Sequence, residues 1–461
     1  MKARSSGILP LFQYESAWKA LLHGLLFLAA LPAFAEPASY FRDVAPILRA
    51  NCVSCHKPGK TKGQLDVTDY AALMKGGKHG ETVVPGKPND SALIDNVSGA
   101  EPEMPKEGES LTKAEVAVLT RWIAEGAKDD TPAKISHVPA APPVYRSLPA
   151  IPAMAFSPDG TLLALAGHHE IILRSADGQQ VLGRLLGESP RLESLAFSPD
   201  GRLLAACGGA ASEWGEIQLW DVASRTLVRS IRASGDSVFG VSFSPDGTRV
   251  AVGCADKLVK AFAVADGQEL MRCDNHLDWV FGTAWTLDGQ RLATASRDKA
   301  LKLIDVATGH LIDDISRPRD PWLGLARSPR ENLIAAGTDT GAVMIYKMEP
   351  RGGRLAEGDD KENSVVKELD RLPGSVPALA WNADGSMVAA AGVAGEVRLW
   401  KAGDWKRVWI AKEKLPPVFA LAFTPDGKRL AAAGADGRVR LLETEKGEVV
   451  GAFDAVPVER P

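Results

Sequence analysis

A five-residue segment recurs at nearly regular intervals along the second two thirds of the chain. Each clear copy begins with an aromatic residue and ends in Asp-Gly, as in FSPDG. Six copies occupy residues 156–160, 197–201, 243–247, 285–289, 381–385 and 423–427, and residues 327–331 form a degenerate seventh. Successive copies lie 41 to 54 residues apart. Because Pro fixes φ and Gly tolerates positive φ, each copy predicts a tight turn.

The residues around each turn follow one order. A strand enters the turn, a strand of small residues such as 291–296 leaves it, and two further strands follow, the first at positions such as 300–305. Four short strands in a period of about 40–45 residues are typical of a β-propeller. The sequence therefore predicts an all-β propeller over residues 150–456.

The first 35 residues have the features of a signal peptide. Basic residues precede an apolar run, residues 21–35, which ends in the A-x-A sequence AFA. We expect cleavage after Ala35, export to the periplasm or another extracytoplasmic compartment of a bacterium, and no integral membrane span afterwards. The alternative is an uncleaved membrane anchor.

The charge balance argues against one class of partner. Lys and Arg number 54 against 58 Asp and Glu, which gives a net charge of −4, or −6 without the first 35 residues. No basic excess is available to neutralise phosphates, so we expect no nucleic-acid partner.

Residues 36–128 have a helical pattern and predict a small all-α domain, which a Pro- and Ala-rich linker at 129–149 joins to the propeller. A first helix, with Pro46 in its first turn or at a kink, leads to Cys52. Its predicted apolar face contains Phe41, Val44, Ile47 and Leu48. The intervening residues 57–110 are long for a loop without secondary structure, so we expect a bound cofactor to pack them.

A second helix follows that loop. Thr112 and Glu115 have the spacing of a capping box, and Gly126 is a suitable stop. Its predicted apolar face contains Val116, Leu119, Trp122 and Ile123.

Cys52, Cys55 and His56 form the sequence C-x-x-C-H, the attachment motif of haem c. Two thiols at this spacing each add to one vinyl group of the porphyrin, and the adjacent His becomes an axial iron ligand. The alternatives are a dithiol redox motif and a fragment of a zinc site. The chain has no second C-x-x-C pair to complete a zinc site, and we expect one haem.

The second axial ligand is predicted to be Met104, which lies in a loop just before the second helix. A thioether donor favours Fe(II) and raises the reduction potential. Met74 is a competing thioether, although its apolar surroundings favour a core position. His79 is a competing imidazole, and an iron without a second protein ligand is the remaining alternative.

Residues 40–127 resemble the planctomycete-type cytochrome c domain, within the class I cytochromes c. The matching residues are Phe41, Asp43, Val44, Pro46, Ile47, Leu48, Cys52, Cys55, His56, Gly63, Leu65, Asp66, residues 84–88, Ser91, Leu93, Ile94, Met104, Pro105, Trp122, Ile123, Gly126 and Ala127. The family usually has a Pro-Pro-x-Gly-like turn after the Met, whereas this chain has Pro105-Lys106-Glu107-Gly108. The resemblance implies haem binding and one-electron chemistry, without a known partner.

Residues 150–455 resemble the WD-repeat family, which implies a seven-bladed propeller. LWD at 219–221 is the full signature, 399–401 and 303–305 are partial ones, and hairpin Asp residues occur at 256, 298, 339 and 436. His276, Ser296 and Asp298 are candidates for the family's hydrogen-bond network, although Ile304 replaces its Trp. Either the segment near 143–148 or the last strand, near 449–453, is expected to close the ring.

Other unusual positions have structural explanations. The insertions 208–215 and 351–372 are interpreted as solvated loops, and His168 and His169 as turn residues rather than a metal pair. Cys207, Cys254 and Cys273 are expected to be buried free thiols; a disulfide between Cys207 and Cys254 is the alternative.

The leading functional hypothesis is an exported one-electron carrier, rather than a catalyst, whose propeller docks an unidentified redox protein or complex. Two alternatives remain open. One is a haem-based redox or gas sensor, or an enzyme acting on a small molecule, which needs a displaceable sixth iron position. The other is a scaffold with a non-essential haem.

Overall fold

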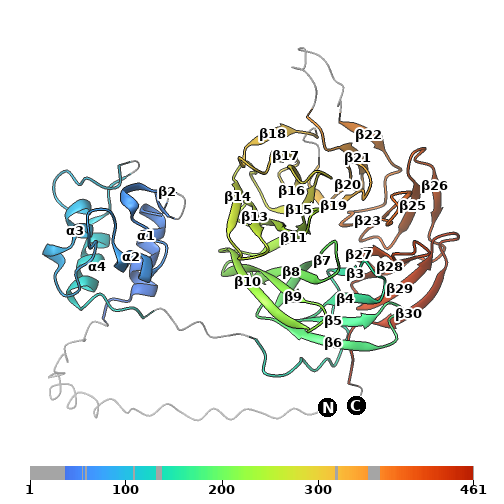
Figure 1. Cartoon of the computed structure of the whole chain (residues 1–461), viewed down its shortest axis with the longest axis horizontal. Coiled ribbons are helices and arrows are strands. Elements are labelled where there is room, and N and C mark those ends of the chain that lie inside the picture. Colours follow the sequence, from blue (N-terminus) through green and yellow to red (C-terminus); the bar gives the residue numbers. More distant parts are fainter. Residues whose placement is uncertain are drawn as a thin grey trace, which may run out of the picture. The chain divides into compact units, whose positions relative to one another are not determined.

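The computed structural model describes residues 37–53, 55–57, 60–106, 109–130, 138–316, 320–350 and 364–459. The expected signal peptide and residues 351–363 of the second insertion lie outside this part of the chain. The chain divides into two compact units, residues 1–135 and 136–461, which are described one at a time (Figure 1).

The N-terminal unit is helical, with one short hairpin. Its elements are the π-helical turn η1 (Tyr40–Val44), α1 (Ala45–Asn51), β1 (His56–Lys57), β2 (Lys60–Thr61), the 3₁₀ turn η2 (Lys62–Gln64), α2 (Tyr70–Lys75), the 3₁₀ turn η3 (Pro88–Asp90), α3 (Ala92–Val97) and α4 (Lys113–Ala124). The stretch 57–110, expected to lack secondary structure, therefore contains two short α-helices and two 3₁₀ turns.

The first predicted helix is present, but one member of its predicted face is wrong. Pro46 lies in the first turn of α1, as expected, while Phe41 is 46% exposed. Tyr40 is buried instead, with its ring centroid 5.5 Å from that of Trp122. Tyr40 precedes Val44, Ile47 and Leu48 by four, seven and eight residues, so it shares their helical face, and its ring packs against Tyr70 and Trp122.

The second predicted helix is confirmed. Thr112 Oγ1 accepts from the backbone N–H of Glu115, and Glu115 Oε2 accepts from the N–H of Thr112, which is the predicted capping box. Leu119, Trp122 and Ile123 are buried in the core of this unit, whereas Val116 is only partly buried.

The C-terminal unit is a seven-bladed β-propeller, as predicted. Its described residues form seven four-stranded antiparallel sheets, each made of consecutive strands. Blades 1 and 2 consist of β3 (Met154–Phe156), β4 (Leu162–Ala166), β5 (Glu170–Ser175), β6 (Val181–Leu186), β7 (Arg191–Phe197), β8 (Leu203–Ala210), β9 (Trp214–Asp221) and β10 (Thr226–Ser234).

Blades 3 to 5 consist of β11 (Val238–Phe243), β12 (Arg249–Cys254), β13 (Val259–Ala263), β14 (Glu269–Cys273), β15 (Val280–Trp285), β16 (Arg291–Ser296), β17 (Leu301–Asp305), β18 (Leu311–Asp314), β19 (Trp322–Arg327), β20 (Leu333–Thr338), β21 (Val343–Lys347) and β22 (Val365–Glu368). Blades 6 and 7 consist of β23 (Ala378–Trp381), β24 (Met387–Ala391), β25 (Val397–Lys401), β26 (Arg407–Ile410), β27 (Val418–Phe423), β28 (Arg429–Gly434), β29 (Arg438–Glu443) and β30 (Val449–Asp454).

The recurring Asp-Gly segment forms the turn between the first two strands of a blade. In blade 1, Ser157 Oγ donates to Asp159 Oδ1 at 2.5 Å and accepts from the N–H of Leu162, and Gly160 has a φ of +72°. Only glycine adopts this φ without strain, so the segment fixes the same turn in each blade that retains it.

The two insertions are more ordered than expected. Residues 208–210 and 214–215 extend β8 and β9, and Gly208 and Gly209 are buried, so the interpretation of 208–215 as a solvated loop is confirmed only for the exposed turn at 211–213. Of the second insertion, residues 365–368 form the outer strand β22. Extra residues that alternate along a strand can continue its hydrogen-bonded ladder instead of leaving it.

The predicted state of the three propeller cysteines is confirmed. Cys207, Cys254 and Cys273 are buried and form no disulfide. Cys207 and Cys254 lie in one apolar cluster between blades 2 and 3, and burial raises the pKa of both thiols.

The ring closes without exchange of a strand between the first and last blades. Each inner strand contacts the next, and β27 of blade 7 contacts β3 of blade 1. Tyr145 pairs with Val458 in an isolated parallel bridge, and the N–H of Ile151 donates to the carbonyl of Gly434. The last part of the segment interpreted as a linker therefore packs on the propeller and helps to close it.

A buried ion pair holds this closing segment. Glu170 is fully buried and accepts two hydrogen bonds of 2.6 Å from Arg184. Tyr145 donates to Glu170 at 2.8 Å, and Arg184 donates to the carbonyl of Pro143.

Replacing Glu170 tests the importance of this closing contact. Glu170→Ala leaves the Arg184 charge without its carboxylate, and we expect the free energy of unfolding of the propeller to fall by about 3–5 kcal/mol. Urea unfolding followed by tryptophan fluorescence measures it. Glu269→Ala, which removes the partly exposed partner of Arg272, should cost no more than about 1 kcal/mol. Equal losses in the two variants would contradict the prediction.

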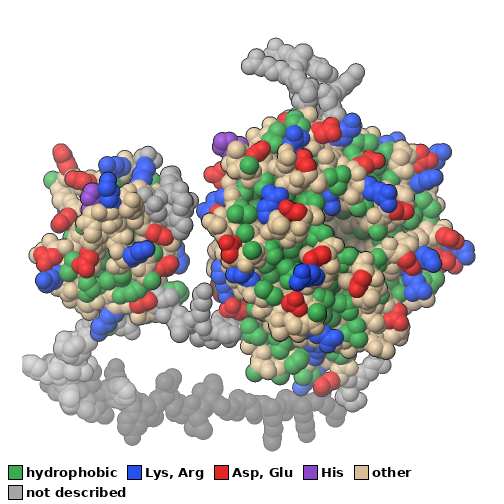
Figure 2. Space-filling view, in the orientation of Figure 1, with side chains coloured by type: hydrophobic (Ala, Val, Ile, Leu, Met, Phe, Trp, Pro, Cys, Tyr) green, Lys and Arg blue, Asp and Glu red, His purple; other side chains and the backbone are tan. Residues whose placement is uncertain are grey.

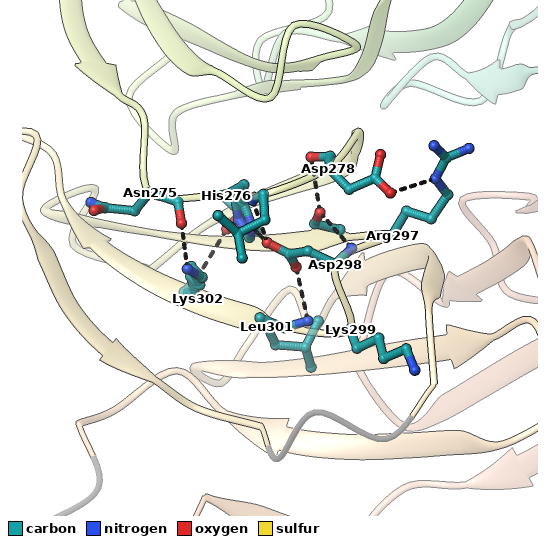
Figure 3. Close-up of polar contacts among 12 residues, drawn as sticks. Asn275, His276, Asp278, Arg297, Asp298, Lys299, Leu301 and Lys302 are labelled. Atoms are coloured by element: carbon teal, nitrogen blue, oxygen red, sulfur yellow. Dashed lines mark hydrogen bonds and ion pairs between the residues drawn. The ribbon is translucent and has the colours of Figure 1, made fainter.

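Blade 4 contains the predicted His–Asp contact (Figure 3). His276 Nδ1 lies 2.8 Å from Asp298 Oδ2, and Nε2 lies 2.8 Å from Thr294 Oγ1. Ser296 belongs to the same network, as predicted: its hydroxyl accepts from the N–H of Asp298 and donates to the carbonyl of Asp278. The strand places Thr294, two residues earlier on the same face, beside the imidazole.

The contact between His276 and Asp298 should make part of the free energy of unfolding of the propeller depend on pH. Burial favours a higher pKa for Asp298, but the hydrogen bond and charge of His276 and the N–H groups of Leu277 and Ala300 lower it from 3.8 to about 2. A carboxylate with a lowered pKa in the folded state stabilises the fold at higher pH, and that contribution is lost as the pH falls from about 4 to about 2.

Asp298→Asn should therefore lose less of its stability than the wild type between about pH 4 and pH 2, because it has no carboxylate to protonate. Urea unfolding at a series of pH values measures the difference. Asp274→Asn, at an exposed position of the same loop, should retain the wild-type profile. Parallel profiles of Asp298→Asn and the wild type would contradict the prediction.

Candidate cofactor site

The predicted cofactor residues line one cavity in the N-terminal unit. Its volume is about 230 Å³, and Cys52, Cys55, His56 and Met104 all border it. Two short segments separated by almost fifty residues of chain meet there.

The C-x-x-C-H sequence follows directly from the end of α1. The N–H of Cys52 donates to the carbonyl of Leu48, and the N–H of His56 donates to that of Cys52 at 3.0 Å. The carbonyl of His56 accepts in turn from the N–H of Val67. These bonds hold the two thiols and the imidazole in one tight turn, supported by a buried helix.

Met104 is held by the other side of the cavity. Its N–H donates at 2.8 Å to the carbonyl of Asn96, near the end of α3, and its half-buried side chain packs against the core. The cavity wall is otherwise largely apolar; Leu65, Val67, Leu93, Val97 and Leu111 contribute to it.

The two competing ligands lie in different places. Met74 packs against the core of the unit and does not border the cavity. His79 does border it, on an exposed turn in which the N–H of Gly77 donates to the carbonyl of Gly80 and the N–H of Lys78 donates to that of Gly63. His79 and Met104 therefore border the cavity, whereas Met74 does not.

The donors and their surroundings fit a covalent haem. His56 Nδ1 is buried and has no hydrogen-bond partner among the described residues, which fits a ring fixed by a ligand bond. Burial raises the pKa of the Cys52 thiol to about 11, whereas the reactive cysteine of a dithiol motif has a lowered pKa. The described residues contain no group of three His, Cys, Asp or Glu that could hold a metal ion.

The rim of the cavity is mostly basic. Lys62, Lys78 and Lys106 border it together with His79, and Glu81 is the acidic member of the lining. Sequence reasoning had not singled out these lysines, because α2, α3 and the turns between them bring them together only in the folded unit.

The comparisons with known proteins agree with this arrangement. Residues 52–108 match the family model of the planctomycete cytochrome C. Residues 225–262, 267–305 and 366–401 match the WD domain, G-beta repeat, and residues 154–239 and 401–458 match the WD40 domain of anaphase-promoting complex subunit 4. The helical unit thus matches a cytochrome c family model, and the propeller matches WD-repeat family models. These matches support a haem-binding protein with a protein-interaction propeller.

Similarity to curated proteins is more limited. Protein HIR1 of Cryptococcus neoformans var. neoformans serotype D, in strains JEC21 and B-3501A, is 26% identical over 179 residues. The match covers 37% of this chain and only 17% of the length of those relatives. Within the described part of the chain, no helix has the length and apolar character needed to cross a membrane.

The turn that carries His79 allows a test of how tightly the cavity wall is packed. A Cβ at Gly77 would lie 2.7 Å from the carbonyl oxygen of Gly63 and 3.2 Å from Cβ of Leu65. We expect Gly77→Ala to lower the free energy of unfolding of the N-terminal unit by about 1–3 kcal/mol. Helical circular dichroism during urea unfolding reports on this unit. Lys78→Ala, at an exposed position in the same turn, should change it by about 0.5 kcal/mol or less.

Proposed function

We propose that Cys52 and Cys55 bind one haem c covalently, that His56 and Met104 are its axial iron ligands, and that the protein is an exported one-electron carrier whose propeller docks a redox partner. The observation that carries the proposal is the meeting of these four side chains at one largely apolar cavity. The apolar run at residues 21–35 supports export.

The four proposed haem-binding residues and the apolar wall have different roles in this proposal. The thiols of Cys52 and Cys55 would hold the group by thioether bonds, each S–H adding across one vinyl group to give a C–S and a C–H bond without net oxidation. When bound, the haem supplies one-electron oxidation and reduction. His56 donates its imidazole nitrogen, and Met104 donates a thioether that favours the reduced state. The apolar wall, including Leu93 and Val97, limits access of water to the site.

An electron carrier needs an iron with both axial positions filled, whereas a sensor or an enzyme needs one that opens. Two observations support an iron with both axial positions filled. The N–H of Met104 donates to the carbonyl of Asn96, and the Met104 side chain packs against the core. His79 favours a second candidate, a sensor with an exchangeable ligand, because it borders the same cavity from an exposed turn.

Optical spectra of the exported, haem-loaded chain distinguish the two. The haem should stay with the polypeptide on denaturing electrophoresis. The wild type should be low-spin, show the Met–iron charge-transfer band when oxidised, and fail to bind carbon monoxide when reduced. Met104→Ala should lose the band and bind carbon monoxide, because it removes the thioether.

Two matched variants complete this experiment. Met74→Ala and His79→Ala should retain the wild-type spectrum, since neither removes a proposed ligand. Loss of the low-spin spectrum in His79→Ala alone would transfer the ligand assignment to His79. Ready binding of carbon monoxide by the wild type would contradict the carrier role and favour sensing or catalysis.

A further inference from the structure

Two lysines on the rim of the cavity in the N-terminal unit have no role in the proposed function. Lys62 lies in η2 and Lys78 in the turn that follows α2, and both residues border the cavity. Both are exposed, and neither forms an ion pair with a described residue, although Lys87 and Arg121 of the same unit do. Figure 2 shows Lys and Arg side chains beside a His side chain on the surface of this unit. We call Lys62 and Lys78 the lysine pair.

The backbone holds the lysine pair together. The N–H of Lys78 donates at 2.7 Å to the carbonyl of Gly63, the residue that follows Lys62. A Cβ at Gly77 would lie 2.7 Å from the same carbonyl oxygen, so a glycine is needed there for the two segments to approach so closely. Two positively charged residues from separate segments therefore meet at one part of the rim.

The charges around the lysine pair favour an anionic ligand. Two neighbouring ammonium groups repel each other, and a negative charge between them offsets this repulsion. Glu81 is the acidic residue of the described cavity lining, and it forms no ion pair with either lysine. The lining also includes apolar residues such as Leu93 and Val97, among which an unpaired charge is costly. An anion that belongs to a group in the cavity is therefore stable at the rim, beside the lysine pair.

We propose that Lys62 and Lys78 bind the propionate carboxylates of the haem. The proposal rests on the proposed function, in which Cys52 and Cys55 hold the haem covalently, and it assigns the residues that receive its negative charges. Haem carries two propionate groups in addition to the two vinyl groups that the cysteines use. A lysine side chain has a flexible four-carbon stem, so its ammonium group can reach a carboxylate from the rim.

The other anionic ligand to consider is the acidic surface of a partner protein. A stable protein interface covers roughly 800 Å² of each partner, whereas the lysine pair occupies a single backbone contact at the cavity. Lys106 also borders the cavity, but it comes from the segment that carries Met104, and no described hydrogen bond joins it to the pair. A covalent haem brings two carboxylates to this cavity in every molecule, so the propionates are the ligand that the observations favour.

Nuclear magnetic resonance titration of the reduced, haem-loaded chain, with carbon-13 in the propionate carboxylates, tests the proposal. We expect Lys62→Gln and Lys78→Gln each to raise the pKa of a propionate, with an acid dissociation constant about tenfold smaller, because the carboxylate loses a neighbouring positive charge. Lys62→Arg and Lys78→Arg retain the charge and should titrate like the wild type. Exposed ion pairs contribute little to folding stability, so all four variants should fold.

Lys75→Gln is the matched control. Lys75 is an exposed lysine at the end of α2 and lies outside the described cavity lining. Its replacement removes the same charge from a neighbouring position and should leave both propionate titrations unchanged. Wild-type titrations in both Lys62→Gln and Lys78→Gln would overturn the proposal and favour a partner's acidic surface as the ligand. An effect of Lys75→Gln equal to theirs would also overturn it.

The same samples separate this proposal from the proposed function. Covalent attachment of the haem and the low-spin optical spectrum report on Cys52, Cys55, His56 and Met104, and they should be unchanged in every lysine variant. Retention of both with wild-type propionate titrations means that the lysine assignment alone has failed. Absence of covalent haem from the wild type means that the proposed function has failed, and the lysine assignment with it.

Discussion

Closure of the ring is the constraint on which the larger unit depends. The ring is closed only if the last blade packs against the first, and here β27 of blade 7 contacts β3 of blade 1. No strand is exchanged between the first and last blades to fasten the join. The fully buried Glu170, paired with the partly exposed Arg184, instead holds Tyr145 and its neighbours against blade 1. Tyr145 also pairs with the C-terminal segment at Val458. The segments around Tyr145 and Val458, which are distant in the sequence, thus meet where the first and last blades join.

The same ring encloses a cavity of about 910 Å³, which residues of all seven blades line. Seven blades that each place an inner strand around one axis leave a space in the middle, and the side chains that enter it are those at the beginning of each strand. Blade 4 adds rigidity, because the buried His276–Asp298 contact fixes the loop that carries Leu277 and Trp279. A structural network inside one blade therefore holds the loop that enters its inner strand.

The N-terminal unit is smaller than the propeller and is built around a cavity. Its helices are short. The cavity is lined by residues of α1, of the turn after α1 and of the segment that follows α3, and it is much larger than the voids of a packed core of this size. Well-packed interiors contain few voids. Fixed donors around an apolar space indicate that the unit is built around a group that fills it, which is the physical basis of the haem proposal. Sequence reasoning anticipated the principal residues because C-x-x-C-H and its spacing to Met104 are local patterns, but it did not find the basic rim.

Local and periodic features were readable from the sequence. The repeated Asp-Gly turns predicted the propeller, since the Ser157–Asp159 contact and the positive φ of Gly160 arise within five residues. The capping box of Thr112 and the attachment motif at Cys52 are equally local. Tertiary structure alone decided the rest: the burial of Tyr40 in place of Phe41, the choice of Thr294 beside His276, the strand extension at 208–215, and the presence of His79 but not Met74 at the cavity. Each depends on which distant segment packs against the residue, and no pattern within a single segment of the chain contains that information.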